Sequence, residues 1–158
     1  MKKKLISPKG LKPQGIGPQI IRLGLPFLIA GTIVQIYWPN FVKLSEYNFP
    51  FVWISGFLMI LIGAIAYAIA IIQLLKNFSK GNLIKHGIFS ISRNPIYASW
   101  NLLIFPGLAF LCNNWLFLLG AFAMNGMFYI SIKKEESQLE AAFGDEFETY
   151  KKEVPRLI

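Results

Sequence analysis

A short polar motif and a pair of acidic residues stand at the two ends of a long uncharged segment. The motif is SRNPIY at residues 92–97, and the acids are Glu135 and Glu136. Residues 94–132 contain no Asp, Glu, Lys or Arg. Because one membrane crossing needs about 20 apolar residues, this segment is long enough to cross a bilayer and return. The hairpin would bring Arg93 and the acids to one membrane face, where polar groups at the edge of an apolar bundle suit chemistry on a lipid-soluble substrate.

The elements that position these residues are predicted from the clustering of apolar side chains. Hydrophobic residues make up 54% of the 158 residues, which is too apolar for an ordinary soluble domain. Charged side chains are costly at the bilayer centre, so long uncharged windows indicate spans. We predict an all-α polytopic membrane protein with about four transmembrane helices and a C-terminal amphipathic cytoplasmic helix. The spans are predicted at residues 20–38, 50–75, 95–112 and 114–132, and the C-terminal helix at residues 133–154.

Local signals refine this arrangement. Asn113-Asn114 is predicted to form the turn of the hairpin, and Pro106 is predicted to kink and loosen its first arm. Gly56 and Gly63 are expected to allow close helix contact. Residues 1–19, rich in Lys, Pro and Gly, are predicted to form a basic cytoplasmic arm. The loop at residues 76–94 is too polar to lie in lipid and is expected to fold onto protein or a ligand.

The basic residues predict the orientation. Fifteen of the 16 Lys and Arg residues fall in the N-terminal arm, the central loop or the C-terminal tail, and only Lys43 falls on the other side. The positive-inside rule then predicts a multi-pass protein of the cell membrane with both termini in the cytoplasm.

Composition also excludes several functions. The formal net charge of +8 is explained by this topology and by attraction to anionic lipid headgroups, so no nucleic-acid partner is predicted. Cys112 and His86 are the only residues of their types, which excludes an intrachain disulfide and argues against a metal site. The predicted partners are the lipid bilayer and a lipophilic small-molecule or lipid acceptor.

The phase of the tail predicts which acid is buried. Leu139 and Phe143 recur at helical spacing and mark a buried face. Glu135 lies four residues before Leu139 and eight before Phe143, so it is predicted to share that face. Glu136 is predicted to lie on the wetter side. A break in the tail is expected near Gly144.

In several of these motifs the chain resembles a known group of proteins, the isoprenylcysteine carboxyl methyltransferase and phospholipid methyltransferase superfamily. The resemblance covers about residues 73–156, and its motifs occur in a fairly specific order and spacing. They are NFS at 77–79, LIKHGIF at 83–89, RNPIY at 93–97, EESQL at 135–139, FG at 143–144, Tyr150 and VPR at 154–156.

The resemblance implies an integral membrane enzyme that transfers a methyl group from S-adenosylmethionine, with residues 20–158 forming one methyltransferase-like domain. It also implies a cytoplasm-facing pocket for the methyl donor, between the loop before the hairpin and the helix after it. The cofactor contacts that it implies are Gly81, Asn82, Leu83, Ile84, His86, Phe89, Asn94, Pro95, Ile96, Tyr97 and Glu135.

The residue types suit that chemistry. A sulfonium donor is already activated, so the protein mainly positions donor and acceptor and excludes water. Glu135 is suited to pairing with the donor's amine or ribose, and Arg93 to gripping a carboxylate through two hydrogen bonds. Tyr97 and Phe89 are suited to stacking on adenine or facing the sulfonium. An acceptor amine would also need a base.

Arg93, Glu135 and Glu136 are the predicted catalytic residues, and Glu135, Glu136 and His86 are the candidate bases. The same residues also have structural interpretations: an interfacial anchor for Arg93, and a cap or ion pair for Glu135.

The chain departs from the superfamily pattern at four positions. Asn94 stands where a histidine is usual, Ile88 where a proline is usual, and Ser99 where a glycine is common. Ser131 stands where the prenylcysteine branch has an arginine that helps to hold the substrate. This difference weakens the specific prediction of carboxyl methylation. Two alternatives follow: a non-enzymatic accessory or assembly subunit on the same scaffold, and a reductase-like NADPH-binding protein.

Overall fold

The computed structural model describes residues 17–46, 50–78 and 81–158, and every regular element in these ranges is helical. The all-α prediction is therefore confirmed for the described residues, whereas most of the predicted basic arm lies outside them. The elements in chain order are α1 (Gly17–Tyr37), α2 (Pro39–Val42), α3 (Pro50–Phe78), η1 (Gly87–Ser90), α4 (Pro95–Ala98), η2 (Ser99–Ile104), α5 (Phe105–Leu111), α6 (Trp115–Phe143) and α7 (Asp145–Glu153).

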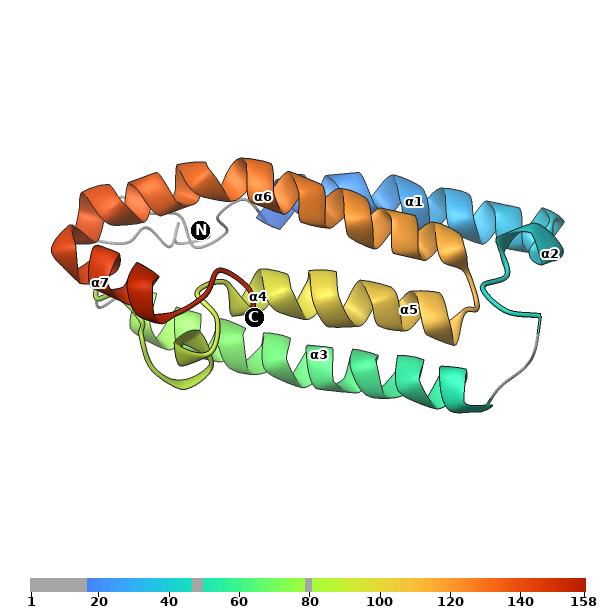
Figure 1. Cartoon of the computed structure of the whole chain (residues 1–158), viewed down its shortest axis with the longest axis horizontal. Helices are drawn as coiled ribbons and strands as arrows, with labels where there is room; N and C mark the ends of the chain where they lie inside the picture. The colour runs from blue at the N-terminus through green and yellow to red at the C-terminus, as the bar shows by residue number, and fades with distance from the viewer. Residues whose placement is uncertain (1–16, 47–49, 79–80) are drawn as a thin grey trace, which may run out of the picture.

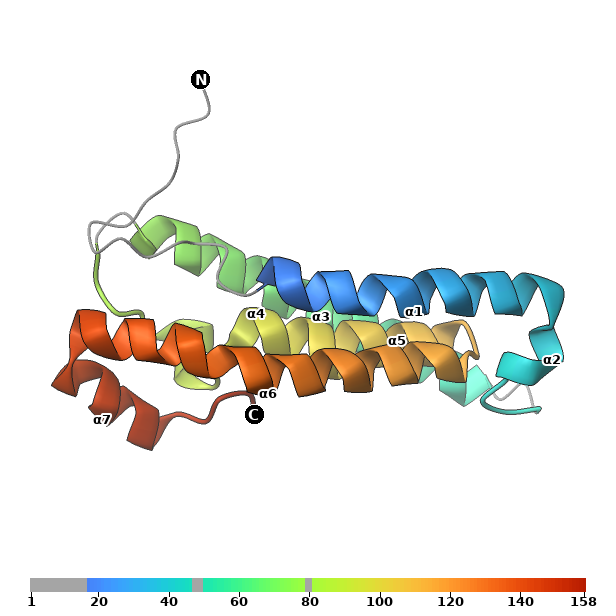
Figure 2. The ribbon, with the colours of Figure 1, turned by 90° about the horizontal axis from the view of Figure 1, so that it is seen from above.

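The long helices pack side by side in the order α1, α6, α5, α3 (Figures 1 and 2). The segment α4–η2–α5 and helix α6 are the two arms of the predicted hairpin, and they contact each other along their lengths. The C-terminal ends of α3 and α6 therefore lie at the same end of the bundle as α4 (Figure 1). This end carries the residues that the sequence singled out.

Two described helices are long and apolar enough to cross a membrane, Pro50–Asn77 and Trp115–Phe143. Arg22–Tyr37 and Pro95–Leu111 are shorter apolar helices. Only 11% of the most apolar window of α3 is buried, and Phe51 on this helix is 79% exposed. A helix that is apolar on its outward face suits contact with lipid. The four-span topology and the cytoplasmic termini stay predictions.

Glycines let α3 approach α5 closely, as predicted from their positions. A Cβ on Gly56 would lie 2.8 Å from the carbonyl oxygen of Gly107, and a Cβ on Gly107 would lie 2.9 Å from that of Gly56. Gly63 likewise faces Ile104 and Ser99. Because the backbones touch at these points, a larger residue would force the helices apart.

The turn of the hairpin forms at the predicted asparagines. Asn113 adopts a positive φ of 49°, a conformation that asparagine tolerates better than most residues. Asn114 caps α6 by accepting a hydrogen bond from the backbone N–H of Leu116 at 3.0 Å. Both features end one arm and start the next within a few residues.

The first arm departs from α geometry just before Pro106. Residues 99–104 form a π-helical turn, in which the N–H of Phe105 bonds to the carbonyl of Trp100 five residues earlier. Proline has no N–H for the usual i→i−4 bond, so the preceding turn loses its regular pattern. The helix is therefore irregular where local loosening was predicted, and the predicted kink stays a prediction.

The second arm does not end where the sequence predicted. One helix, α6, runs across the predicted boundary at residues 132 and 133 and ends at Phe143. No glycine or proline interrupts residues 127–143, so the helix continues past the apolar span. The predicted break does occur at Gly144, whose φ of 55° starts α7 in a new direction.

Candidate active site

The hairpin brings the basic motif and the acidic pair together. Arg93 Nη1 lies 2.9 Å from Glu136 Oε1, and the two side chains are only 9% and 8% exposed. Arg93 lies two residues before the start of α4, and Glu136 lies in the last turns of α6. The predicted approach of the two ends of the uncharged segment is therefore confirmed.

A second arginine shares the same carboxylate. Arg156 donates from Nε to both oxygens of Glu136 at 3.0 Å and from Nη2 to Oε2 at 2.6 Å. These hydrogen bonds raise the pKa of Arg156. We call Arg93, Glu136 and Arg156 the buried ion cluster. It holds two positive charges and one negative charge.

The C-terminal segment after α7 accepts hydrogen bonds from the motif at residues 92–97 through its backbone carbonyls. It returns from α7 to the start of α4 (Figure 1). The N–H of Arg93 donates to the carbonyl of Pro155 at 2.9 Å. The carbonyl of Arg156 accepts from Ser92 Oγ at 3.2 Å and from Asn94 Nδ2 at 3.0 Å. The amide of Asn94 therefore holds Arg156 in place.

Arg93 is incompletely hydrogen-bonded in this buried position. Its Nε makes no hydrogen bond with any described residue, and Nη1 has the distance of an ion pair with Glu136 without hydrogen-bond alignment. Buried guanidinium groups are normally hydrogen-bonded, because their desolvation is costly. The cluster thus has an excess positive charge and an unused donor, which together suit an anion.

The prediction that Glu135 is buried and Glu136 solvated is wrong. The interior face of α6 includes Phe128 and Ile132, and Glu136 continues it at four-residue spacing. The buried phase was taken instead from Leu139 and Phe143, which pack against α7 rather than against the bundle interior. A long helix can present different faces to different partners, so the tail gave the wrong phase for the bundle.

Glu135 still faces the same end of the hairpin. Tyr97 Oη donates to Glu135 Oε2 at 3.1 Å, and both side chains are partly buried. The ring of Tyr97 packs against that of Phe128, with centroids 5.4 Å apart. The two acids therefore point to different partners: Glu136 to the arginines and Glu135 to Tyr97.

The predicted donor loop packs onto α3 and α7. Ile84 and Phe89 are buried in one cluster with Ala70 of α3, and Ile96 packs against that cluster. Leu83 packs against the cluster of α7 that contains Phe147. These apolar side chains pack against other parts of the protein. A ligand at this loop would therefore contact mainly the loop's backbone.

The polar residues of the loop lie on its outer side. Asn82 and His86 are exposed, and Gly81 turns the chain with a φ of 68°. Lys85 forms an exposed ion pair of 2.9 Å with Glu146 on α7. The structure does not bring His86 into the buried ion cluster.

The start of the hairpin is a short helix. Asn94 is the N-cap residue of α4, and its backbone N–H donates to Ser92 Oγ at 3.1 Å. Pro95 follows at the first helical position, where its missing N–H costs nothing, and it is buried. This geometry fixes the direction in which Tyr97 leaves the helix.

The side chain of Tyr150 on α7 bonds to the loop that precedes the hairpin. Its hydroxyl donates to the carbonyl of Phe89 at 2.6 Å. Burial raises the pKa of Tyr150 to about 12, although the nearby charge of Arg93 opposes this shift. The side chain is 4% exposed, so it belongs to the folded core of this end.

Sequence reasoning assigned no role to Arg156, Ser92 or Tyr150. Arg156 and Tyr150 occur in the motifs of the resemblance, and Tyr150 also lies at helical spacing from Phe143 and Phe147 in the tail. Their contacts with residues about 60 positions earlier depend on the return of the chain after α7.

Two comparisons with known proteins match this chain. The family model for phospholipid methyltransferase matches residues 51–146, which include the hairpin and both acids. The chain is 26% identical over 135 residues to a protein-S-isoprenylcysteine O-methyltransferase of Rattus norvegicus, with 78% of this chain and 45% of the rat protein covered. The chain thus matches less than half the length of that relative. No solved structure matches. Because the family model covers more than half of the chain and places its hairpin and acidic pair inside the match, the chain belongs to the phospholipid methyltransferase family, a group of membrane proteins.

Proposed function

We propose that this protein is an S-adenosylmethionine-dependent methyltransferase that acts on a lipophilic acceptor at the membrane surface. The family supports methyl transfer in general. The observation that carries the assignment to this site is the buried Arg93, which has an unused hydrogen-bond donor beside a cluster with excess positive charge. The four-span topology with cytoplasmic termini belongs to the same proposal.

The buried ion cluster fits the carboxylate of the methyl donor. A guanidinium binds a carboxylate through charge-assisted hydrogen bonds, and burial strengthens such contacts. Glu136 fixes the orientation of Arg93 and keeps its charge in place. Without an anion, Arg93 Nε has no hydrogen-bond partner among the described residues.

The second acid fits the other polar groups of the donor. Glu135, oriented by Tyr97, would pair with its amine or ribose hydroxyls. The backbone of residues 81–84 would line the same pocket, as the family resemblance implies. When bound, the donor supplies a methyl group that is already activated by its sulfonium. The residues of this chain then hold the acceptor in line and exclude water.

Glu135 is the preferred base if the acceptor must lose a proton. Glu136 is bonded to two arginines, so both of its carboxylate oxygens are already engaged. Glu135 accepts a hydrogen bond from the neutral hydroxyl of Tyr97 at 3.1 Å, at the same end of the hairpin. His86 is exposed on the loop, away from the cluster.

Isothermal titration of the purified full chain with S-adenosylhomocysteine tests the proposal. We expect saturable binding that falls about tenfold or more in Glu135→Ala and in Arg93→Lys, because lysine lacks the planar fork of arginine. The matched control is Glu140→Ala, which removes an exposed acid from the same helix and should leave the affinity unchanged.

Two results would reject the proposal. Absence of saturable binding by folded protein would favour the accessory-subunit alternative. Binding of NADPH in place of S-adenosylhomocysteine would favour the reductase-like alternative. Thermal unfolding of each variant shows whether it is folded before it is titrated.

A further inference from the structure

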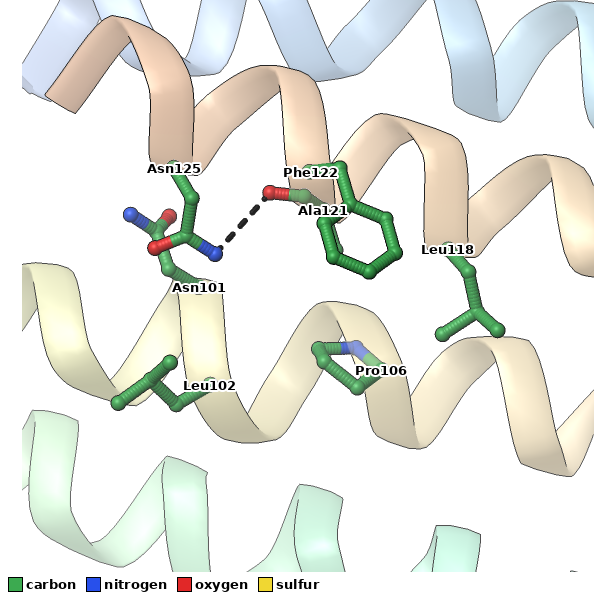
Figure 3. A pocket seen from close by; sticks show the side chains of 7 residues that line it. All are labelled: Asn101, Leu102, Pro106, Leu118, Ala121, Phe122 and Asn125. Atoms are coloured by element: carbon green, nitrogen blue, oxygen red, sulfur yellow. Dashed lines mark hydrogen bonds between the residues drawn. The ribbon is translucent and has the colours of Figure 1, made fainter.

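A cavity lies between the two arms of the hairpin, away from the buried ion cluster. Its volume is about 180 Å³, and it opens to the side of the bundle between α6 and the η2–α5 segment (Figure 3). The lining residues are Asn101, Leu102, Pro106, Leu118, Ala121, Phe122 and Asn125. Phe122 at its mouth is 72% exposed, so the opening faces the surroundings of the bundle.

Asn101 is a buried polar side chain without a partner. It is 1% exposed, and neither its Oδ1 nor its Nδ2 makes a hydrogen bond with any described residue. Figure 3 shows its side chain reaching from η2 toward Asn125 on α6. Asn125 Nδ2 donates only to Ala121 of its own helix at 3.2 Å. An unsatisfied amide in an apolar span is costly, which indicates that another molecule completes it.

The depth of the cavity follows from the sequence. Asn101 follows Arg93 by eight residues, and Asn125 precedes Lys133 by eight residues. Eight residues of helix span about 12 Å, so both amides lie well inside the apolar layer, near its middle. Asn101 also belongs to the π-helical turn before Pro106, and such turns frequently occur at functional sites.

We propose that this cavity binds the neutral polar group of a lipophilic molecule that enters from the bilayer. A hydroxyl or carboxamide matches the amide of Asn101, which offers both a donor and an acceptor. No lining residue is charged, and an ionised group at this depth is disfavoured, so carboxylates and ammonium groups are excluded from the class. The apolar part of the ligand extends past Phe122 into lipid. This site is separate from the methyl-donor site and does not rest on the proposed reaction.

Thermal unfolding of the full chain in a maltoside detergent tests this assignment with three matched probes: dodecanol, dodecane and dodecanoate. Dodecanol should raise Tm by about 3 °C at about ten times its Kd. Dodecane and dodecanoate should give clearly smaller shifts. The dodecanol shift should disappear in Asn101→Leu, and this variant alone should have a higher Tm because it removes an unsatisfied group.

The controls separate this site from the rest of the molecule. Asn114→Leu removes another fully buried asparagine and should keep the dodecanol shift. Glu135→Ala should also keep it, so failure of the donor site and failure of this site are distinguishable. If Asn101→Leu does not fold, Asn125→Leu on the opposite wall replaces it. Equal shifts with dodecanol and dodecane, a strong shift with dodecanoate, or a dodecanol shift retained in the cavity variant would overturn the proposal.

Discussion

The two ends of the α5–α6 hairpin both bury polar side chains, but they satisfy them in different ways. At the turn, Asn114 donates to the carbonyl of Gly31 at 3.0 Å and to Gln35 Oε1 at 2.9 Å, and its own oxygen caps α6. Gln35 in turn donates to the carbonyl of Cys112 at 2.9 Å. These groups are neutral, and each amide is hydrogen-bonded through both its oxygen and its nitrogen.

The opposite end carries charge, and its hydrogen-bond network is incomplete within the described residues. Glu136 is shared by Arg93 and Arg156, and Arg93 Nε has no hydrogen-bond partner in the described chain. A closed network of neutral amides fixes one geometry, which suits a structural turn. A buried network with excess charge and an unused donor can accept a further group. The contrast indicates a structural role for the turn and supports the proposal that a ligand binds at the other end.

Removing the shared carboxylate should give the largest effect. Glu136→Gln leaves two arginines without their counter-charge, which should cost about 3 to 5 kcal/mol and lower Tm by about 10 °C. Binding of S-adenosylhomocysteine should be lost as well. Thermal unfolding and titration measure both, with Glu140→Gln as the exposed control on the same helix. A stable Glu136→Gln protein would show that the cluster does not hold this end together.

Alkaline pH should weaken the charged end through Tyr150. Its folded pKa of about 12 lies above the value of about 10 for an unfolded tyrosine, so the folded state binds more protons in this interval. The stabilisation, about 2 to 3 kcal/mol, is complete below pH 10 and is lost as pH rises toward 12. Unfolding free energies measured across this range should fall less in Tyr150→Phe. Parallel curves for the two proteins would contradict the assignment.

Breaking the neutral end should cost less and leave binding intact. Asn114→Leu removes the α6 cap and one partner of Gln35, at about 2 kcal/mol in total. Because the turn lies at the far end of the hairpin, the affinity for S-adenosylhomocysteine should not change once the protein is folded. Titration below the lowered Tm checks this expectation. A large loss of affinity would mean that the two ends are coupled.

The smallest structural effect is expected at Tyr97. Tyr97→Phe removes one hydrogen bond to Glu135, so Tm should change by less than about 3 °C. Because the tyrosine orients that acid, the affinity for S-adenosylhomocysteine should fall about fivefold, which corresponds to about 1 kcal/mol. Tyr37→Phe alters a 71% exposed ring at the end of α1 and serves as the control. Equal affinities for Tyr97→Phe and the control would remove Tyr97 from the donor site.

The candidate site was predicted in part, and the misassigned acid shows where the prediction failed. The motif around Arg93 and the acidic pair were identified because they stand at the two ends of a long segment without charged residues. The buried member of the pair was misassigned because α6 continues through residues 127–143 and contacts the bundle with one face and α7 with another. Local periodicity gives a phase, but it does not say which neighbour that phase faces.

The sequence by itself determined the helical hairpin, its turn at Asn113-Asn114, the close approach at Gly56 and the break at Gly144. Each depends on composition or on the conformational preference of one or two adjacent residues. The tertiary structure alone decided that Arg156 shares Glu136 with Arg93, that Tyr150 bonds to the loop, and that Asn101 has no hydrogen-bond partner among the described residues. These features join residues far apart in the chain, so they depend on how whole helices pack and where the chain returns.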